Sequence, residues 1–147
     1  MTLKEQLLED MKTAMKEKDL IRKETIQMVR SGILQVEKDK KVTLDDEGVI
    51  DVIAKEVKRR KDVLPDYEKS GRADLIDGIK TEIEVLLHYL PSQLTEEELE
   101  PIVKQTIEET GAASMRDMGK VMSAIMPKIK GRADGRTVNE MIKKILS

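Results

Sequence analysis

The sequence predicts an all-α protein, and three observations agree on this. Apolar residues recur every three or four positions along nearly the whole chain, and no stretch shows the alternation of a strand. Leu, Ile, Met, Glu and Lys are frequent, whereas turn residues are few. The 147 residues contain no Phe, Trp or Cys. The absence of Cys excludes disulfides, thiolate zinc sites and cysteine nucleophiles, and the absence of these rings disfavours base-stacking platforms.

Residues 1–90 form the first predicted domain, a bundle of about four helices with short connections. Four apolar stripes carry this prediction, at 3–15, 21–36, 49–67 and 75–90. Thr2 with Glu5 has the spacing of a capping box, Asp19 is the expected cap of the second helix, and Thr43 is expected to start the third. Pro65 is expected to kink or end the third helix because proline lacks the backbone N–H.

Residues 91–147 form the second predicted domain, a compact unit of three helices. Thr95 with Glu98 is a further capping box, and Pro101 is expected to bend or fray the helix that follows it. Gly111 ends this helix, the next one stops near Pro127, and a loop at 128–135 precedes the last helix.

Basic residues concentrate in this second domain. Residues 116–147 hold eight basic and three acidic side chains, a local net charge of +5 in a chain whose net charge is −2. Closely spaced cations suit a phosphate backbone, and glycines would let backbone amides approach an anion. The alternative is a solvated loop with ordinary turn glycines. The candidate phosphate contacts are Lys120, Lys128, Lys130, Arg132 and Arg136, with Gly119, Gly131 and Gly135 as points of close backbone approach.

Other motifs have a structural interpretation beside the functional one. The bases at 58–61 are adjacent, so they spread around a helix and are expected to form a solvated face. His88 has no partner at a diagnostic spacing, and its place near a helix end is explained by the helix dipole. Gly-Arg-Ala-Asp occurs at 71–74 and 131–134, where the Asp can cap a helix. The methionines after residue 114 are a core stripe or, alternatively, a peptide-binding groove.

The motif at 117–135, DMGKVMSAIMPKIKGRADG, resembles the GatB/YqeY family, and so do the flanking segments 89–98 and 138–140. The resemblance covers nearly the whole chain, which looks like a stand-alone bacterial YqeY-like protein. It implies that the C-terminal part is similar to the tail domain of the B subunit of the glutamine-dependent aminoacyl-tRNA amidotransferase. In that enzyme the tail contacts tRNA, and a separate domain carries the chemistry.

The resemblance therefore implies a tRNA-associated, non-catalytic binding module, with no metal and no cofactor. The alternatives are a protein-interaction adaptor for an amidotransferase or synthetase, or a carbon–nitrogen ligase with glutamine as amido donor. We expect no DNA partner and no membrane association. The N-terminal residues lack the apolar core of a secretory signal, so the expected location is the cytoplasm.

Overall fold

The computed structural model describes residues 1–147 and is entirely helical, with no strand. The chain divides into two compact units, Met1–Leu90 and Pro91–Ser147. The first unit contains α1 (Leu3–Lys16), α2 (Leu20–Lys40), α3 (Asp46–Ser70) and α4 (Ala73–Leu87). The second contains α5 (Glu96–Thr110), the short 3₁₀ helix η1 (Met115–Asp117), α6 (Met118–Ile129) and α7 (Gly135–Leu146).

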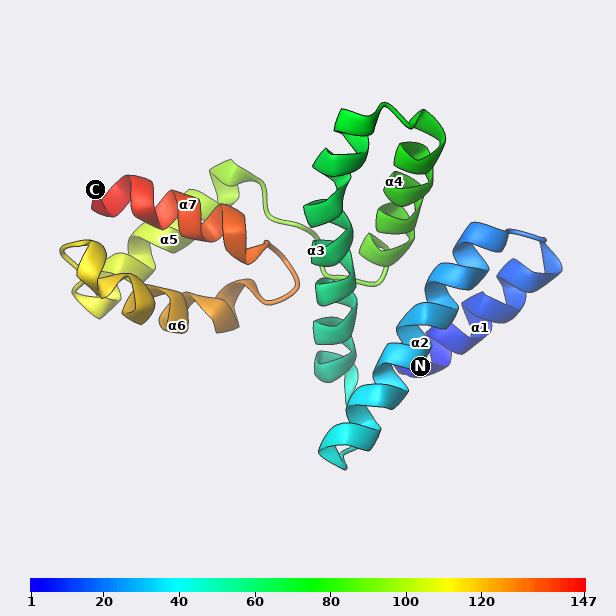
Figure 1. The fold of residues 1–147 in the computed structure, drawn as a ribbon. Coiled ribbons are helices and arrows are strands. Elements are labelled where there is room, and N and C mark those ends of the chain that lie inside the picture. The colour runs from blue at the N-terminus through cyan, green and yellow to red at the C-terminus, as the bar shows by residue number, and fades with distance from the viewer. The chain divides into compact units, whose positions relative to one another are not determined.

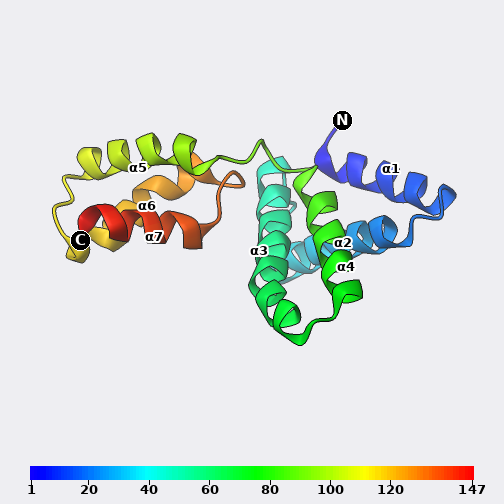
Figure 2. The ribbon, with the colours of Figure 1, turned by 90° about the horizontal axis from the view of Figure 1, so that it is seen from above.

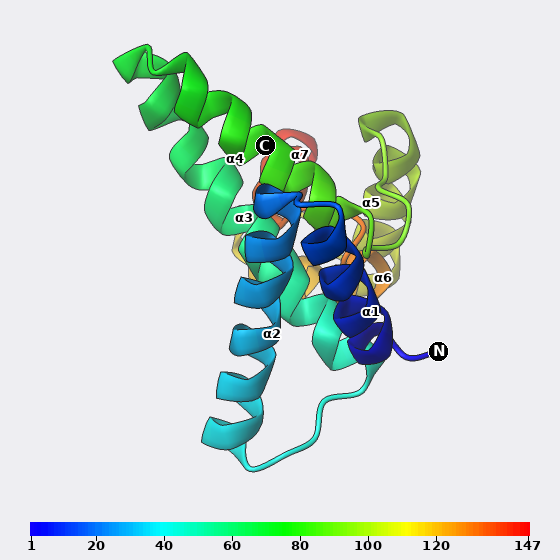
Figure 3. The ribbon, with the colours of Figure 1, turned by 90° about the vertical axis from the view of Figure 1, so that its right-hand side faces the viewer.

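The first unit is built from two helical hairpins. Figure 1 shows α1 antiparallel to α2 and α3 antiparallel to α4, and α2 also packs against α3 and α4. Figure 3 shows that the C-terminal end of α2 continues beyond α1 before the chain returns to α3. Burial of the apolar stripes drives this packing. The fully buried core residues are Leu7, Ile26, Val29, Val49, Ile53 and Leu86.

A buried tyrosine fastens the end of the first unit to its beginning. Tyr89 is 6% exposed, and its hydroxyl donates to Oδ2 of Asp10 at 2.5 Å. Arg22 lies 3.9 Å from the other oxygen of the same carboxylate. His88 packs its ring edge-on against Tyr89 at 5.3 Å between ring centroids and is itself exposed. This ring contact accounts for the position of His88 without a catalytic role.

The basic run at 58–61 is not a uniformly solvated face, because Arg60 is buried. Its Nη1 donates to Oε2 of Glu56 at 2.7 Å, and its Nε lies 3.8 Å from Glu82 of α4. Arg59, the adjacent residue, has a side chain that is 74% exposed. Four consecutive residues cover most of a helix circumference, so at least one of them faces the neighbouring helices.

Several helix boundaries differ from the predicted ones. α3 begins at Asp46, with the Asp45 carboxylate accepting from Gly48 N at 2.9 Å, and not at Thr43. The segment before it is held as a link because Leu44 N donates to the Glu37 carboxylate at 2.8 Å. Pro65 does not end α3, and α6 continues past Pro127 to Ile129.

The second unit packs α5, α6 and α7 against one another around its own core (Figure 2). The first turn of α5 is capped and not frayed, because Thr95 and Glu98 complete the capping box ahead of Pro101. Of the two Gly-Arg-Ala-Asp motifs, Asp134 caps α7, whereas α4 has no side-chain cap. The core residues are Leu99, Val103, Val121, Ile125, Ile129, Val138 and Ile142. Among all the helices, none combines the length and the apolar character that crossing a membrane requires.

Candidate nucleic-acid interface

Lys120 lies on the first turn of α6 and is exposed, as is its neighbour Gly119. Ala113 N donates to the Asp117 carboxylate at 2.9 Å, and this bond holds the pKa of Asp117 below its ordinary value. The charge of Lys120 acts in the same direction. A Cβ on Gly119 would meet no atom within 4 Å, so this position has open space outside the helix.

Lys128 lies near the other end of α6 and ties that helix to α5. Its Nζ is 2.8 Å from Oε2 of Glu109 and 3.1 Å from Oγ1 of Thr106. Thr106 is buried and donates its own hydroxyl hydrogen to the carbonyl of Ile102 at 2.7 Å. The charge of Lys128 is therefore already partly matched within the unit.

The loop between α6 and α7 is joined to the segment that leads into α5. Gln93 Nε2 donates to the carbonyl of Gly131 at 2.7 Å, and Leu94 N donates to the carbonyl of Arg132 at 2.8 Å. The Nε of Arg132 in turn donates to the carbonyl of Ser92 at 3.2 Å. Gly131 has φ of +73°, a left-handed conformation that side chains rarely adopt.

The start of α7 already carries a carboxylate. Asp134 accepts from Thr137 N at 2.8 Å and from the Thr137 hydroxyl at 3.0 Å, which satisfies the donors that an incoming anion would use. Gly135 is the first residue of α7 and has open space around its Cα. Arg136 is exposed and lies 3.5 Å from Glu140, one turn further along.

The predicted cations thus fall into two groups. Lys120 and Arg136 project from the first turns of two helices with exposed side chains. Lys128 and Arg132 make contacts that hold the unit together. Lys130, in the loop, is half-buried and interacts within the chain. No described interaction brings all five to one point, so any phosphate contacts would follow an extended backbone and not a single anion.

Sequence reasoning missed the polar bonds of residues 92–94 to the loop, because their partners lie about forty positions away. It also passed over Lys143 and Lys144, which add exposed charge at the end of α7. The structure contains no group of three or more His, Cys, Asp or Glu side chains arranged to hold a metal ion.

Comparison with protein families gives a match along almost the whole chain. Residues 4–146 match the model of the family described as Yqey-like protein. A protein of Pyrenophora tritici-repentis named altered inheritance of mitochondria protein 41, mitochondrial, is 28% identical over 141 residues, which are 93% of this chain and 77% of that protein. Its namesake in Lachancea thermotolerans is 38% identical over 85 residues, covering 57% of this chain and 46% of that protein.

A second kind of relative carries tRNA in its name. A glutamyl-tRNA(Gln) amidotransferase subunit from the archaeon Sulfurisphaera tokodaii is 42% identical over 92 residues, which are 54% of this chain and 14% of that subunit. The expected likeness to an amidotransferase is thus found as a weak match to a small part of a large protein.

The predicted cytoplasmic location is wrong, because the fungal relatives are named mitochondrial proteins. The prediction was based on the lack of a secretory signal and of Cys. Both observations argue against secretion, but neither separates the cytoplasm from the mitochondrion. The expectation of a bacterial protein also has no support from these fungal and archaeal matches.

Proposed function

The chain belongs to the YqeY-like family, and from this membership we propose that it is a non-catalytic module that binds tRNA through its second unit. The observation that carries the proposal is the match to the archaeal amidotransferase subunit. The aligned segment is only 14% of that protein but 54% of this chain. A segment shared by two proteins of such different size is best explained as a module that both contain. The name of the larger protein supplies tRNA as the candidate ligand.

The charge of the second unit supports the same ligand. Residues 116–147 carry a net charge of +5, while the acidic residues of the unit concentrate in α5. Lys120 and Arg136 are exposed and lie outside the contacts that hold the unit together. The chain has two Tyr and neither Phe nor Trp, which disfavours base stacking and favours contacts to the phosphates of folded RNA.

A tRNA titration at two salt concentrations tests the proposal. The wild-type chain is expected to bind bulk tRNA at low salt and to lose affinity steeply as salt rises, because binding releases counterions from the phosphates. The double variant Lys120→Glu, Arg136→Glu is expected to bind more weakly. Its salt slope should fall by about one for each phosphate that the variant no longer touches.

Lys104→Glu is the matched control, since Lys104 is an exposed lysine of the same unit that pairs with Glu100 on acidic α5. It is expected to leave tRNA affinity nearly unchanged. The proposal fails if the wild-type chain shows no salt-sensitive binding at micromolar concentration. It also fails if the control and the double variant lose the same affinity, because general charge would then account for the effect.

A further inference from the structure

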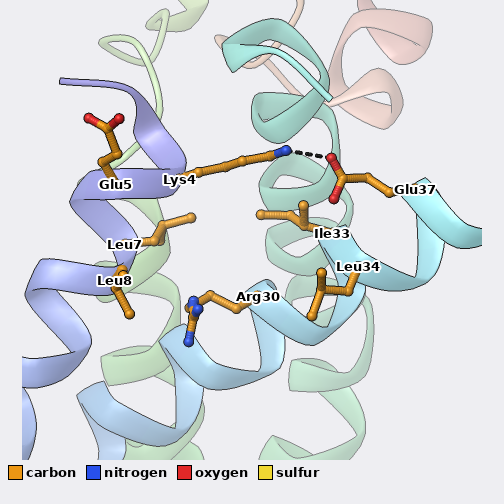
Figure 4. A pocket seen from close by; sticks show the side chains of 8 residues that line it. All are labelled: Lys4, Glu5, Leu7, Leu8, Arg30, Ile33, Leu34 and Glu37. Carbon is orange, nitrogen blue, oxygen red and sulfur yellow. Dashed lines mark hydrogen bonds and ion pairs between the residues drawn. The ribbon is translucent and has the colours of Figure 1, made fainter. Parts of the chain in front are cut away.

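An apolar recess of the first unit lies between α1 and α2. It has a volume of about 250 Å³. Figure 4 shows Lys4 reaching across from α1 to Glu37 of α2, with Leu7 and Ile33 pointing toward each other beneath that ion pair. We call this recess the α1–α2 groove. Its lining residues are Lys4, Glu5, Leu7, Leu8, Arg30, Ile33, Leu34 and Glu37.

Both carboxylates of the α1–α2 groove are already engaged. Glu37 pairs with Lys4 and accepts from Leu44 N at 2.8 Å, and these bonds hold the pKa of Glu37 below its ordinary value. Glu5 accepts from Thr2 N at 3.2 Å as half of the capping box. Neither acid is therefore positioned to neutralise another cation of the groove.

Arg30 is that other cation. Its side chain enters the groove from α2 (Figure 4), and its one described partner is the Sδ of Met11 at 3.5 Å. A thioether is a weak acceptor and cannot balance a guanidinium charge. Because Arg30 is half-buried, it has also lost part of its hydration. A carboxylate brought by another molecule would complete this site with a charge-assisted hydrogen bond.

The surface around Arg30 is apolar and incompletely covered. Leu34, one turn along α2 from Arg30, is 64% exposed, and Met15 at the far end of α1 is 53% exposed. Leu8 and Met11 are half-buried and lie at helical spacing from Met15, so α1 contributes a continuous apolar edge. This edge faces the surface formed by Arg30 and Leu34.

We propose that the α1–α2 groove docks an amphipathic helix of a partner protein, which inserts leucine-sized side chains and presents an Asp or Glu to Arg30. A volume of about 250 Å³ is below the roughly 300–1,000 Å³ typical of small-molecule pockets, which favours side chains over a cofactor. A seam between two helices is also the usual seat of a third helix. The proposal goes beyond tRNA binding, since it concerns the other unit and stands without it.

Selection from a phage-displayed library of amphipathic helical peptides, with randomised positions flanking the apolar face, tests the proposal on the full chain. Enriched peptides are expected to carry Asp or Glu beside their apolar anchors. Their affinity is expected to fall about tenfold or more for Arg30→Glu, as for a lost charge-assisted bond. Replacing the peptide's acid by Lys is expected to restore binding to Arg30→Glu. Leu34→Ser should also weaken binding, and its exposure makes unfolding no explanation.

Arg72→Glu is the control, because it changes the same charge at an exposed position of the same unit. It should bind the selected peptides like the wild type. No enrichment, or peptides indifferent to Arg30 and Leu34, would overturn the proposal. Two other outcomes also overturn it: concentration-dependent dimerisation lost in Leu34→Ser, which identifies a second copy as the occupant, and Leu34-dependent co-sedimentation with phosphatidylcholine vesicles, which identifies a lipid surface.

Discussion

The Nε of Arg132 donates to the carbonyl oxygen of Ser92 across 3.2 Å, and the carbonyl of Arg132 accepts from Leu94 N at 2.8 Å. One residue of the α6–α7 loop therefore holds the segment before α5 from both sides. The charge of Arg132 also helps to lower the pKa of Glu98, after the hydrogen bonds from Thr95. A loss of RNA binding on Arg132→Glu would thus have two explanations, since the change disturbs the fold as well as the charge.

Arg132→Lys separates these explanations. The lysine keeps the positive charge but lacks the Nε–H that bonds Ser92, so the free energy of unfolding is expected to fall by about 0.5–1.5 kcal/mol. The affinity for tRNA should stay within about twofold of wild type if charge alone matters. Urea unfolding and tRNA titration measure the two effects. Unchanged stability with a large loss of affinity would show instead that the guanidinium itself touches RNA.

Arg60→Ala is expected to destabilise the first unit by about 3–5 kcal/mol, because it leaves the buried carboxylate of Glu56 without its counter-charge. The neighbouring change Arg59→Ala should cost less than about 1 kcal/mol, since the Arg59 side chain is 74% exposed. Urea unfolding followed by circular dichroism compares the two variants. Adding Glu56→Gln to Arg60→Ala should recover part of the loss. Equal costs at both arginines would contradict the assignment.

Tyr89 predicts a loss of stability at alkaline pH. Burial, followed by the hydrogen bond to Asp10, raises the pKa of Tyr89 well above its ordinary value of 10.0. A raised folded pKa stabilises the fold fully below the unfolded pKa, and this stabilisation is lost as pH rises above about 10. The free energy of unfolding should therefore decline above pH 10.

Tyr89→Phe is the matching variant. It should lose about 1.5–3 kcal/mol at neutral pH, as for a hydrogen bond to a charged group, and should show a shallower alkaline decline than wild type. Chemical unfolding at pH 7 and at pH 10.5 measures both effects. The absorbance titration of tyrosine supplies a second readout, because its late step should vanish in the variant. An identical alkaline decline in both proteins would refute the role given to Tyr89.

Two glycines of the second unit are expected to respond to alanine in opposite directions. Gly119 lies in α6 with no atom within 4 Å of an added Cβ, so Gly119→Ala should stabilise the chain by about 0.5–1 kcal/mol. Gly131 has φ of +73°, so Gly131→Ala should cost about 1–2 kcal/mol. Thermal unfolding measures both. If RNA approaches the backbone at Gly119, the stabilised variant should nevertheless bind tRNA more weakly than wild type, whereas unchanged affinity would contradict a close approach there.

Local signals were the predictable part of this molecule. Capping at Thr2, Asp19, Thr95 and Asp134 is confirmed because each bond closes within three residues. The all-α class is confirmed for the same reason, since helical periodicity is a local property. The α1–α2 groove was not predictable, because it depends on how two helices pack.

The candidate interface shows the same division. Basic composition identified Lys120 and Lys128 alike, yet only the structure shows that Lys128 is engaged by Thr106 and Glu109 on another helix. The burial of Arg60 was hidden for a related reason. A charged residue is expected at the surface, and its carboxylate partner, Glu56, signals burial only when Glu82 of α4 closes the site from outside.

The bonds from residues 92–94 to the α6–α7 loop set the limits within which the three-helix unit is portable. A protein that carried this unit as a fused part and began it at the first helix, Glu96, would leave the carbonyls of Gly131 and Arg132 without their partners. The transferable cassette therefore begins upstream of Ser92, in a stretch with no helix of its own. Gene fusions, excised fragments and chimaeras that include these few residues should fold, and those that cut at the helix start should not fold as well.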